Sequence, residues 1–403
     1  MKKLEKSVPI IRFKGFYEAW EQRKLRDIAN YRNGKAHEQV EDEDGKYTII
    51  NSKFISTNGK VQRYTNEQVE PIFDGEIAMV LSDLPNGKAL AKLFLVKEDG
   101  KYTLNQRIAG ITPNENIDPI FLNFRMNRNN YFLKFDSGVT QTNLSKSQVE
   151  NFIALYPTFD EQYKIGLFFT QLDDTIALHQ RKLDALKLMK KAFSQQIFPE
   201  NNRKKPKIRF TSFYEEWEQR KIGEYGYFYY GKSAPKWSVA QDATTPCVRY
   251  GELYTKFGPE IDIVHSYTNI DKSNLKFSSG NEVLVPRVGE NPLDFANCSW
   301  LSISNVAIGE MISVYNTEQY PLFIAYYFRS KMKYEFAKRV EGGNVSNLYY
   351  SYLEDILISV PSIEEQKKIA EFLNKIDITI NLLQNKLGRI KELKKAYLQN
   401  MFI

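Results

Sequence analysis

Apolar residues recur at alternating steps of three and four in two stretches of the chain, residues 157–198 and 361–402. This heptad pattern is typical of a coiled coil, and in both stretches it continues for more than four heptads. The two stretches align without a gap at an offset of 204 residues, so that Gln162 corresponds to Gln366 and Asp173 to Asp377. The pattern therefore predicts two long, related helices, and each has an obvious pairing partner in the other.

A shorter repeat lies upstream of each long helix. Residues 12–24 read RFKGFYEAWEQRK and residues 209–221 read RFTSFYEEWEQRK, an offset of 197. The shared aromatic residues favour a structural segment that packs beneath the following domain. The alternative is that Glu21 and Arg23 meet a charged partner at an interface.

The segments between these markers, residues 25–156 and 222–360, share little except a closing signature. The signature is Gly138 followed by Thr142-Asn143-Leu144 in one half, and Gly342 followed by Ser346-Asn347-Leu348 in the other. Constant ends around an unlike middle indicate a duplicated scaffold that carries two different binding domains, because a repeat solenoid would vary evenly along its length.

The variable segments show the short apolar runs and turn residues of mixed α and β structure. The predicted strands are 47–50, 77–80, 92–96, 246–250 and 282–285. Aromatic-rich amphipathic runs predict helices over 120–132 and 322–336. We therefore predict a conserved segment (1–24), a variable domain (25–157) and a long helix (158–198) in the first half. The second half follows with a linker that includes the repeated segment (199–221), a second variable domain (222–361) and a second long helix (362–403).

Composition places the chain among ordinary globular proteins, because 42% of its 403 residues are hydrophobic and 26% are charged. The net charge of +7 permits an anionic partner without requiring one. Cys247 and Cys298 lie far apart and in no CxxC pattern, which predicts neither a disulfide framework nor a zinc site. The N-terminal sequence lacks the apolar run of a signal peptide, and no stretch has the roughly 18 apolar residues of a membrane helix. We therefore expect a cytoplasmic protein without membrane contact.

Residues for covalent chemistry are sparse. His37, His179 and His265 are isolated from one another, which argues against a metal cluster or a Ser-His-Asp site. His179 occupies a seam position of the first long helix and is predicted to be a packed histidine. The run Asn-Pro-Leu-Asp at 291–294 resembles the Asn-Pro-Pro-aromatic run of adenine methyltransferases, but it lacks the second proline and the aromatic residue. Because phosphate-binding glycine motifs are also missing, we expect no catalysis by this chain alone.

The two variable domains, each closed by a P-x-x-x-E-Q run and a long helix, resemble the specificity subunit of type I restriction-modification systems. Residues 104–108 (LNQRI) and 342–346 (GGNVS) are also similar to short sequence motifs in the target recognition domains of that family. The resemblance covers nearly the whole chain. It implies an α+β fold in which two pseudo-symmetric α/β target recognition domains are separated by a long antiparallel two-helix coiled coil.

The resemblance also implies partners. These are double-stranded DNA, two methyltransferase subunits and restriction/motor subunits, and this chain would direct adenine methylation and cleavage by those subunits. S-adenosylmethionine, ATP and Mg²⁺ would belong to the partner subunits, and this chain would hold no cofactor. Because the two variable domains differ, we expect two unlike half-sites and therefore an asymmetric, bipartite DNA site.

Base readout requires side chains with paired donors and acceptors, which are Arg or Lys toward guanine and Asn or Gln toward adenine. In the first domain we predict DNA contacts from Lys35, Lys53, Lys88, Gln106 and Arg107. In the second domain we predict DNA contacts from Lys232, Lys236, Arg249, Tyr250 and Arg287. For each of them a solvated surface position is the alternative.

A second apolar stripe lies outside the heptad seam of each long helix. Its members are predicted to bind a partner and are Phe168, Leu178, Met189, Phe372, Leu382 and Leu393. The stripe indicates a bundle with further helices, supplied either by a methyltransferase subunit or by the chain's own domains. Lys190 and Lys394 interrupt the two seams at the same place, and we predict that they fix the helix register.

Two other functions fit parts of the pattern. A self-contained restriction enzyme or methyltransferase would need a nuclease or cofactor motif, which the sequence does not display. A coiled-coil scaffold with two protein-binding domains explains constant ends and unlike middles equally well. Sequence-selective DNA binding separates this scaffold from a specificity subunit.

Overall fold

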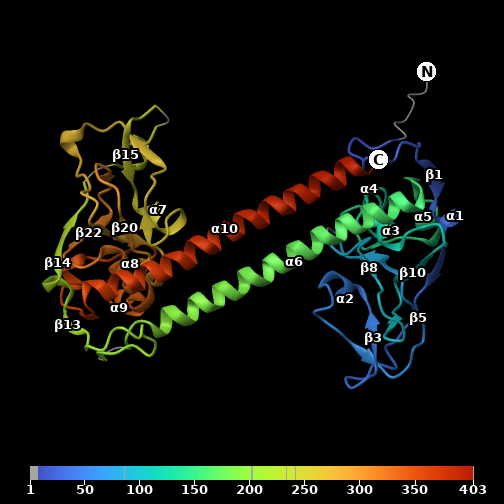
Figure 1. Ribbon diagram of the computed structural model, residues 1–403, viewed down its shortest axis with the longest axis horizontal. Coiled ribbons are helices and arrows are strands. Elements are labelled where there is room, and N and C mark those ends of the chain that lie inside the picture. Colours follow the sequence, from blue (N-terminus) through green and yellow to red (C-terminus); the bar gives the residue numbers. More distant parts are fainter. Residues whose placement is uncertain (1–7, 86, 201–202, 233, 241, 403) are drawn as a thin grey trace. The chain divides into compact units, whose positions relative to one another are not determined.

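The computed structural model describes residues 8–85, 87–200, 203–232, 234–240 and 242–402. The chain forms two compact units, in which unit 1 comprises residues 1–180 and 386–403, and unit 2 comprises residues 181–385. Both long helices, α6 (Phe159–Gln196) and α10 (Ile363–Met401), begin in one unit and end in the other (Figure 1). The first seven residues and part of the polar linker, residues 201–202, lie outside the described residues.

The elements of unit 1 match the prediction of mixed α and β structure. They are β1 (Glu21–Lys24), α1 (Leu25–Ile28), β2 (Ala29–Asn33), β3 (Tyr47–Ile50), α2 (Ser52–Ser56), β4 (Tyr64–Thr65), β5 (Pro71–Ile72), β6 (Ile77–Val80), β7 (Ser82–Asp83), β8 (Leu93–Leu95), β9 (Tyr102–Leu104), β10 (Ile108–Pro113), α3 (Pro119–Met126), α4 (Asn130–Leu133), β11 (Thr142–Asn143), α5 (Lys146–Glu150) and β12 (Ile153–Tyr156). One sheet has the order β2-β10-β6-β8 with antiparallel neighbours. A second sheet has the order β4-β3-β9-β5, in which β3 and β9 are parallel.

Unit 2 repeats this plan with different side chains. Its elements are β13 (Glu218–Lys221), η1 (Ile222–Glu224), β14 (Gly226–Tyr230), η2 (Lys236–Ser238), β15 (Thr245–Val248), α7 (Tyr250–Thr255), β16 (Glu260–Ile261), β17 (Ser266–Thr268), η3 (Lys272–Asn274), β18 (Glu282–Pro286), β19 (Val288–Gly289), η4 (Pro292–Ala296), β20 (Ser299–Leu301), β21 (Ala307–Ile308), β22 (Ile312–Thr317), α8 (Pro321–Lys331), α9 (Lys333–Ala337), β23 (Glu341–Gly342), β24 (Ser346–Asn347), η5 (Tyr350–Tyr352) and β25 (Leu357–Val360). The order β14-β22-β18-β20-β16 matches the first sheet of unit 1, with one strand added. The order β17-β15-β21 matches the first three strands of the second sheet, β4-β3-β9, and its parallel pair is β15 with β21.

The predicted strands are confirmed in position, with one correction at an end. Strands β3 and β6 occupy the predicted ranges, β8 lies inside 92–96, and β18 begins at the predicted Glu282. All four residues of β6 are buried, as expected for a central strand covered on both faces. The prediction of a strand over 246–250 is wrong at its end. The strand β15 stops at Val248 because Arg249 caps the start of α7, where its backbone N–H donates to Glu252 (3.0 Å).

Both predicted domain helices are interrupted. The run 120–132 forms α3 and α4, because Arg128 has a left-handed φ of 50° and Asn129 caps α4 through the N–H of Tyr131 (2.9 Å). The run 322–336 forms α8 and α9, which change direction at Met332. Apolar periodicity continues across both breaks because both helices of each pair pack into one core, which includes Phe121 and Phe132 in unit 1. Periodicity alone therefore did not reveal the breaks.

The repeated segment upstream of each domain packs against it as predicted through its tryptophan, but the prediction is wrong for the shared tyrosines, because Tyr17 and Tyr214 are both 80% exposed. Trp20 and Trp217 are 3% and 1% exposed. The strands β1 and β13 pair with β12 and β25, the strands that lead into the long helices. Arg23 pairs with Glu21 of its own strand, and its counterpart Arg220 pairs with Glu218 in the same way. Among the described residues, these charges are thus matched locally.

The same segment is fixed to the long helices by two equivalent ion pairs. Arg12 donates from Nε and Nη2 to the two carboxylate oxygens of Glu161, both at 2.7 Å. Arg209 donates to Glu365 in the same geometry, at 2.8 and 2.7 Å. Glu161 and Glu365 are buried, in the first turns of α6 and α10. Each unit therefore closes its own helix start with a bidentate Arg–Glu pair.

The closing signature forms equivalent strands in the two units. Strand β11, which holds Thr142 and Asn143, pairs with β7, and β24 pairs with β19 in the same way. The next residues, Leu144 and Leu348, are buried, and their N–H groups bond the carbonyls of Leu81 and Arg287, both at 2.8 Å. The signature thus ties the chain to the strand that follows the central strand of each sheet.

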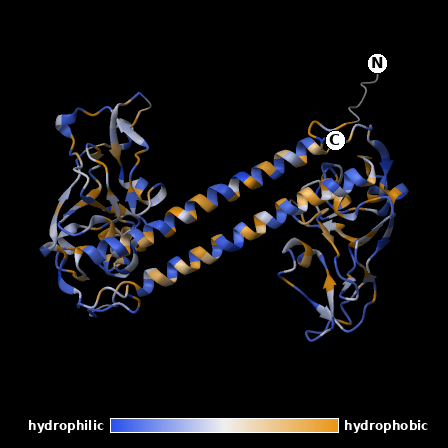
Figure 2. Cartoon of the chain, in the orientation of Figure 1, coloured by the Kyte–Doolittle hydropathy of each residue, from blue (hydrophilic) through white to orange (hydrophobic). Residues whose placement is uncertain are grey.

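The two long helices pair antiparallel within each unit. In unit 1, Lys394 of α10 bonds Asp173 of α6, with 2.5 Å between Nζ and Oδ1. In unit 2, Lys190 of α6 lies 2.5 Å from Asp377 of α10. The offset of 204 residues maps one pair onto the other, so both lysines predicted to set register make equivalent interhelical contacts. Polar and apolar positions alternate along both helices (Figure 2), and along the described chain no helix combines the length and apolar character needed to cross a membrane.

Replacing Lys190 and Lys394 together by Leu is expected to leave the chain folded but to allow alternative helix pairings. Leu fits an apolar seam, whereas the Lys–Asp pairs match only one register. Native mass spectrometry would then show more than one assembly state. The control is K191L/K395L, which changes the neighbouring exposed lysines at the same offset. A single assembly state in K190L/K394L would remove the register role.

Candidate nucleic-acid interface

Unit 1 has an open hollow of about 570 Å³ at the ends of the parallel strands β3 and β9. Its lining residues are Asn51, Ser52, Lys53, Val61, Arg63, Asn105, Gln106 and Arg107. The sequence predicted three of these, Lys53, Gln106 and Arg107, as DNA contacts, and the fold brings them together. The lining contains three cationic side chains and amides, and no carboxylate. Such a set offers the donors and acceptors that base edges and phosphates bind.

The loop that carries Gln106 and Arg107 has an unusual backbone. Residues 105–107 connect β9 directly to β10, and Arg107 has a φ of 66° in the left-handed region. A side chain at such a φ costs free energy that glycine would avoid, and such residues concentrate at functional sites. The N–H of Gln106 is held by the side chain of Asn105 at 2.8 Å. The turn therefore presents Arg107 at a position where local stability alone would favour Gly.

Two acidic residues lie beside the hollow of unit 1. Nε2 of Gln106 donates to Glu38 at 2.5 Å, and Arg63 donates to both carboxylate oxygens of Glu41 at 3.0 and 3.1 Å. These pairs are exposed, so they contribute little to stability and can be exchanged for a ligand. Arg63 was missed by sequence reasoning, because a single Arg in a polar segment carries no pattern.

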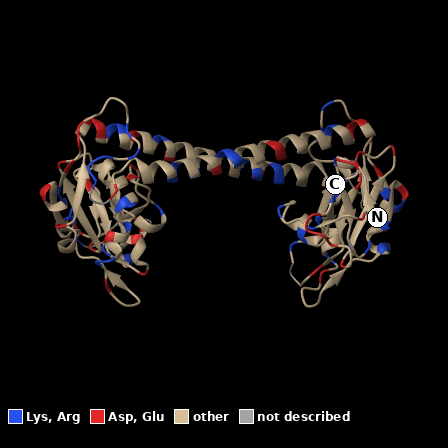
Figure 3. Cartoon of the chain, turned by 90° about the horizontal axis from the view of Figure 1, so that it is seen from below, with Lys and Arg blue, Asp and Glu red and all other residues tan. Residues whose placement is uncertain are grey.

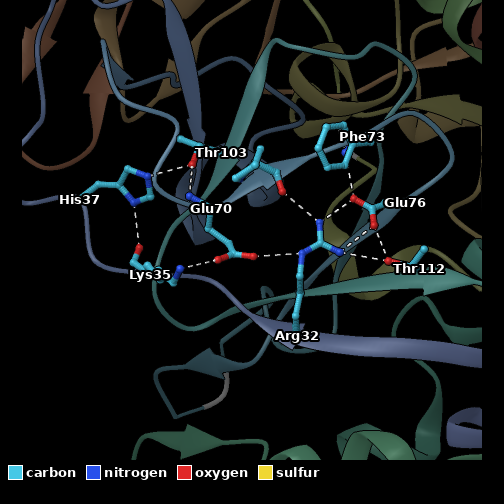
Figure 4. A network of polar contacts seen from close by, with 9 residues as sticks. Arg32, Lys35, His37, Glu70, Phe73, Glu76, Thr103 and Thr112 are labelled. Carbon is cyan, nitrogen blue, oxygen red and sulfur yellow. Dashed lines mark hydrogen bonds and ion pairs between the residues drawn. The ribbon is translucent and has the colours of Figure 1, made fainter.

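Lys35 lies at the exposed end of a polar network that includes buried groups (Figure 4). Its Nζ is 3.1 Å from Glu70, which also accepts from Nε of Arg32 at 3.1 Å. Arg32 donates two further hydrogen bonds to Glu76, both at 2.6 Å. Burial by itself would raise the pKa of Glu76, but the hydrogen bonds from Arg32, Thr112 and the Phe73 N–H lower it overall. Glu76 is therefore a charged structural group.

The same network fixes the backbone at Lys35. His37 is buried, and its Nδ1 lies 2.8 Å from the Lys35 carbonyl while its Nε2 lies 3.0 Å from the Thr103 hydroxyl (Figure 4). Because a carbonyl only accepts, Nδ1 carries the proton in this bond. Thr103 also accepts the N–H of Glu70 at 3.0 Å. The lysine backbone is thus rigid while its side chain is 62% exposed.

The other predicted residues are not gathered in one place. Lys88 is exposed on the loop after β7, where Asp83 accepts the N–H groups of Ala89 and Leu90 at 2.6 and 3.1 Å. In unit 2, Lys236 is exposed in η2, beside Trp237, which is 79% exposed. Figure 3 shows both signs of charge dispersed over the units. In this view, the described residues of neither unit form a region of a single charge sign.

Arg287 is held between aromatic rings in unit 2. Its guanidinium carbon lies 4.4 Å from the ring centre of Tyr230 and 5.6 Å from that of Tyr349. Its Nε is buried and has no hydrogen-bond partner among the described residues. Two stacked rings restrict the side chain, which reduces the entropy lost when it binds a planar or anionic ligand.

Tyr250 lines a smaller hollow in unit 2, of about 330 Å³. The other lining residues are Tyr254, Val288, Gly289, Glu290, Asn291, Asp294 and Val345. Asn291 accepts the N–H of Leu293 at 3.2 Å and donates to Asp294 at 3.0 Å. These bonds cap η4, so the run 291–294 has a structural role.

The predicted partner-binding stripe divides into covered and exposed positions. Phe168 packs on Phe13 and on Tyr397, at 5.8 and 5.1 Å between ring centres. Phe372 packs in the equivalent way on Phe210 and Phe193, at 5.9 and 5.0 Å. The other four are 41–65% exposed, and they are Leu178, Met189, Leu382 and Leu393. The chain's own repeated segment thus covers one end of each stripe.

Histidines and other metal-binding residue types do not cluster in the described parts of the chain. No group of three or more His, Cys, Asp or Glu residues there is placed to hold a metal ion. His179 is half-buried on α6, and His265 stacks on Phe257 with 5.6 Å between ring centres. Both described cysteines are buried and free.

Known proteins are similar to this chain in sequence or in fold. The family model described as the type I restriction modification DNA specificity domain matches residues 17–188 and 214–392. The MjaX and MjaVIII type I restriction enzyme specificity subunits of Methanocaldococcus jannaschii are 25% and 24% identical to it, over 94% of this chain and 91% of each relative. The type I restriction-modification S subunit of M. genitalium has a similar fold, with a TM-score of 0.62, 12% identity, and coverage of 98% of this chain and 99% of that one.

Proposed function

Because the chain belongs to the type I restriction-modification DNA specificity family, we propose that it reads an asymmetric, bipartite DNA site and directs adenine methylation and cleavage by partner subunits. Members of this family recognise DNA sequence as non-catalytic subunits and hold no cofactor of their own. S-adenosylmethionine, ATP and Mg²⁺ would then belong to two methyltransferase subunits and to restriction/motor subunits.

One observation supports the proposal of a bipartite DNA site. The two units have the same strand arrangement but differ in the side chains at equivalent positions. The connection Asn105-Gln106-Arg107 in unit 1 follows β9, and Gly309-Glu310-Met311 occupies the equivalent connection after β21. One connection offers an amide and a guanidinium, and the other offers a carboxylate and an apolar side chain. These groups favour different bases, so equivalent scaffolds would read unlike half-sites.

Methylome sequencing of a host that carries this chain with its methyltransferase subunit tests the proposal. We expect one methylated motif with two unlike specified parts and an unspecified spacer. A palindromic motif would contradict the asymmetric reading. If no sequence-selective methylation and no selective DNA binding were found, a scaffold with two protein-binding domains would replace the proposal.

The lengths of the long helices suggest how the spacer is set. Helices α6 and α10 contain 38 and 39 residues, and each spans roughly 55–60 Å at about 1.5 Å per residue. Recognition domains centred about 40–50 Å apart would cover roughly 12–15 base pairs of DNA. We therefore propose that the helices act as a ruler between the two half-sites.

Adding four residues to both long helices is expected to lengthen the accepted spacer. Insertions after Arg181 and Asn385 lie at equivalent positions under the offset of 204. They add about 6 Å of helix, which corresponds to about one to two base pairs. Methylation of substrates with graded spacers measures the change. Substituting four exposed helix residues without changing the length is the control, and an unchanged spacer preference in an active insertion variant would exclude the ruler.

The exposed part of the apolar stripe supports two equivalent partner sites. Unit 1 displays Leu178 from α6 and Leu393 from α10, and unit 2 displays their counterparts Leu382 and Met189. A repeated pair of apolar positions suits two copies of the same methyltransferase subunit. Phe168 and Phe372 contribute to such sites indirectly, because their partly buried rings pack on other aromatic rings of the same unit.

A further inference from the structure

Lys35 and Lys232 occupy the same place in the two units, and the offset of 197 residues that relates the two repeated segments also maps Gly34-Lys35 onto Gly231-Lys232. Each follows a glycine directly after the first strand of its sheet, β2 or β14. The N–H of Gly34 bonds the carbonyl of Ile108 at 2.8 Å, and the N–H of Lys35 bonds that of Leu104 at 3.1 Å. These acceptors are the first residue of β10 and the last residue of β9.

The lysine of unit 2 is bound by the same pattern. Gly231 donates to Ile312, the first residue of β22, at 3.1 Å, and Lys232 donates to Ile308, the last residue of β21, at 2.9 Å. The two Gly-Lys pairs are therefore structurally equivalent.

Close packing explains the glycines. A Cβ on Gly34 would overlap the backbone carbonyl of Asn105, and a Cβ on Gly231 would overlap that of Gly309. Both obstacles are the first residue of the three-residue connection between the two neighbouring strands. Each glycine thus allows the chain to pass directly against that connection, and the lysine that follows is delivered beside it.

No such packing requirement explains the lysines. Both side chains are exposed. Among the described residues, the Lys35 ammonium pairs with Glu70, whose side chain is 15% exposed and is also bound by Arg32, and Lys232 bonds the carbonyl of Ser273 at 3.2 Å. Because Arg32 also neutralises Glu70 and the Lys35 side chain is 62% exposed, the lysine itself contributes little to stability. The partners of the two ammonium groups, Glu70 and the Ser273 carbonyl, are not equivalent residues, so these contacts do not explain why both positions hold a lysine.

The surroundings of the two lysines differ in chemistry. Asn105, Gln106 and Arg107 adjoin Lys35, whereas Gly309, Glu310 and Met311 adjoin Lys232. Both units have a lysine at this position, although the residues around it differ between the units. Such a lysine suits a DNA feature that is the same in both half-sites. In double-stranded DNA, that shared feature is the phosphate backbone, while the base edges differ.

We propose that Lys35 and Lys232 make equivalent phosphate contacts in the two half-sites, and that neither reads a base. The proposal rests on the proposed function, because it requires that the chain bind DNA through both units. The rigid backbone would place each ammonium group beside the residues that read bases, and binding would exchange Glu70 or the Ser273 carbonyl for a phosphate oxygen. The lysines would thereby set the orientation of each unit on the duplex.

The test uses the full chain in complex with its methyltransferase subunit and a duplex carrying the methylated motif of its host. Affinity is measured over a series of salt concentrations for K35Q, K232Q and the double variant. Each single variant is expected to lower the magnitude of the slope of log K against log[salt] by about 1, and the double variant by about 2. The methylated motif should be unchanged in all three. The control is K97Q. Lys97 is exposed and follows β8 beside the start of β6, whereas Arg107 lies beside the end of β6.

Two results would overturn the phosphate assignment while the proposed function stands. One is a wild-type slope in K35Q or K232Q, which would leave the lysines as solvated side chains. The other is a changed or relaxed motif, which would make them base readers. A wild-type complex without sequence-selective binding would instead contradict the proposed function itself.

Discussion

Replacing Arg209 with Met is expected to destabilise unit 2 by about 3 kcal/mol, because the buried carboxylate of Glu365 loses its partner. The Arg209 side chain is 16% exposed and that of Glu365 is 1% exposed, so water reaches the pair poorly. The hydrogen bond with Glu365 raises the pKa of Arg209, so a change of pH cannot remove the guanidinium charge.

The same change in the other repeat is expected to act on the other unit. Arg12→Met leaves Glu161 buried without its partner and should destabilise unit 1 by a similar amount. Hydrogen–deuterium exchange followed by mass spectrometry separates the two effects, because it reports peptides of each unit individually. Faster exchange should be concentrated in unit 2 for R209M and in unit 1 for R12M.

Arg220→Met is the matched control for R209M. Arg220 forms an ion pair with Glu218 on the same repeated segment, but the two side chains are 49% and 57% exposed. Surface pairs contribute about 0–1 kcal/mol, so this variant should unfold almost like the wild type. The double variant R209M/E365M should recover much of the loss, since no charge remains buried. If R209M cost no more than R220M, the anchoring role of the buried pair would be wrong.

Replacing Arg107 with Gly is expected to weaken specific DNA binding by about 1–3 kcal/mol while leaving unit 1 folded. The guanidinium is lost from the hollow that also contains Lys53 and Gln106. Glycine relieves the left-handed φ of 66°, but it also gains conformational freedom in the unfolded chain. These two terms oppose each other, so the free energy of unfolding should change by no more than about 1 kcal/mol.

Arg128→Gly is the control for this separation of binding from stability. Arg128 also has a positive φ, 50°, and it lies outside the lining of the hollow. It should therefore show the same small change in unfolding and unchanged DNA affinity. Titration with matched duplexes would also show one relaxed position in the half-site for R107G. If R107G and R128G bound DNA alike, Arg107 would not be a contact.

Sequence reasoning located part of the candidate site. It singled out Lys53, Gln106 and Arg107, which meet in one hollow, because the donor chemistry of DNA contacts is a property of residue type. It missed Arg63 in that hollow, and it left open whether the chain's own domains or a methyltransferase subunit would cover Phe168 and Phe372. That cover comes from Phe13 and Phe210, which are distant in the chain, so it depends on how the repeated segment docks.

The sequence by itself determined the duplication, the two long helices and the two lysines that interrupt their seams at equivalent places. These features follow from local periodicity and from a repeat that aligns without a gap, so they need no knowledge of distant contacts. The repeat offset of 197 residues also maps Gly34-Lys35 onto Gly231-Lys232. Only the tertiary structure decided what surrounds these two lysines. The physical reason is that backbone hydrogen bonds and the space left at Gly34 and Gly231 bring each lysine beside a three-residue connection that is distant in the chain. The side chains of these two connections have diverged while the backbone geometry was kept.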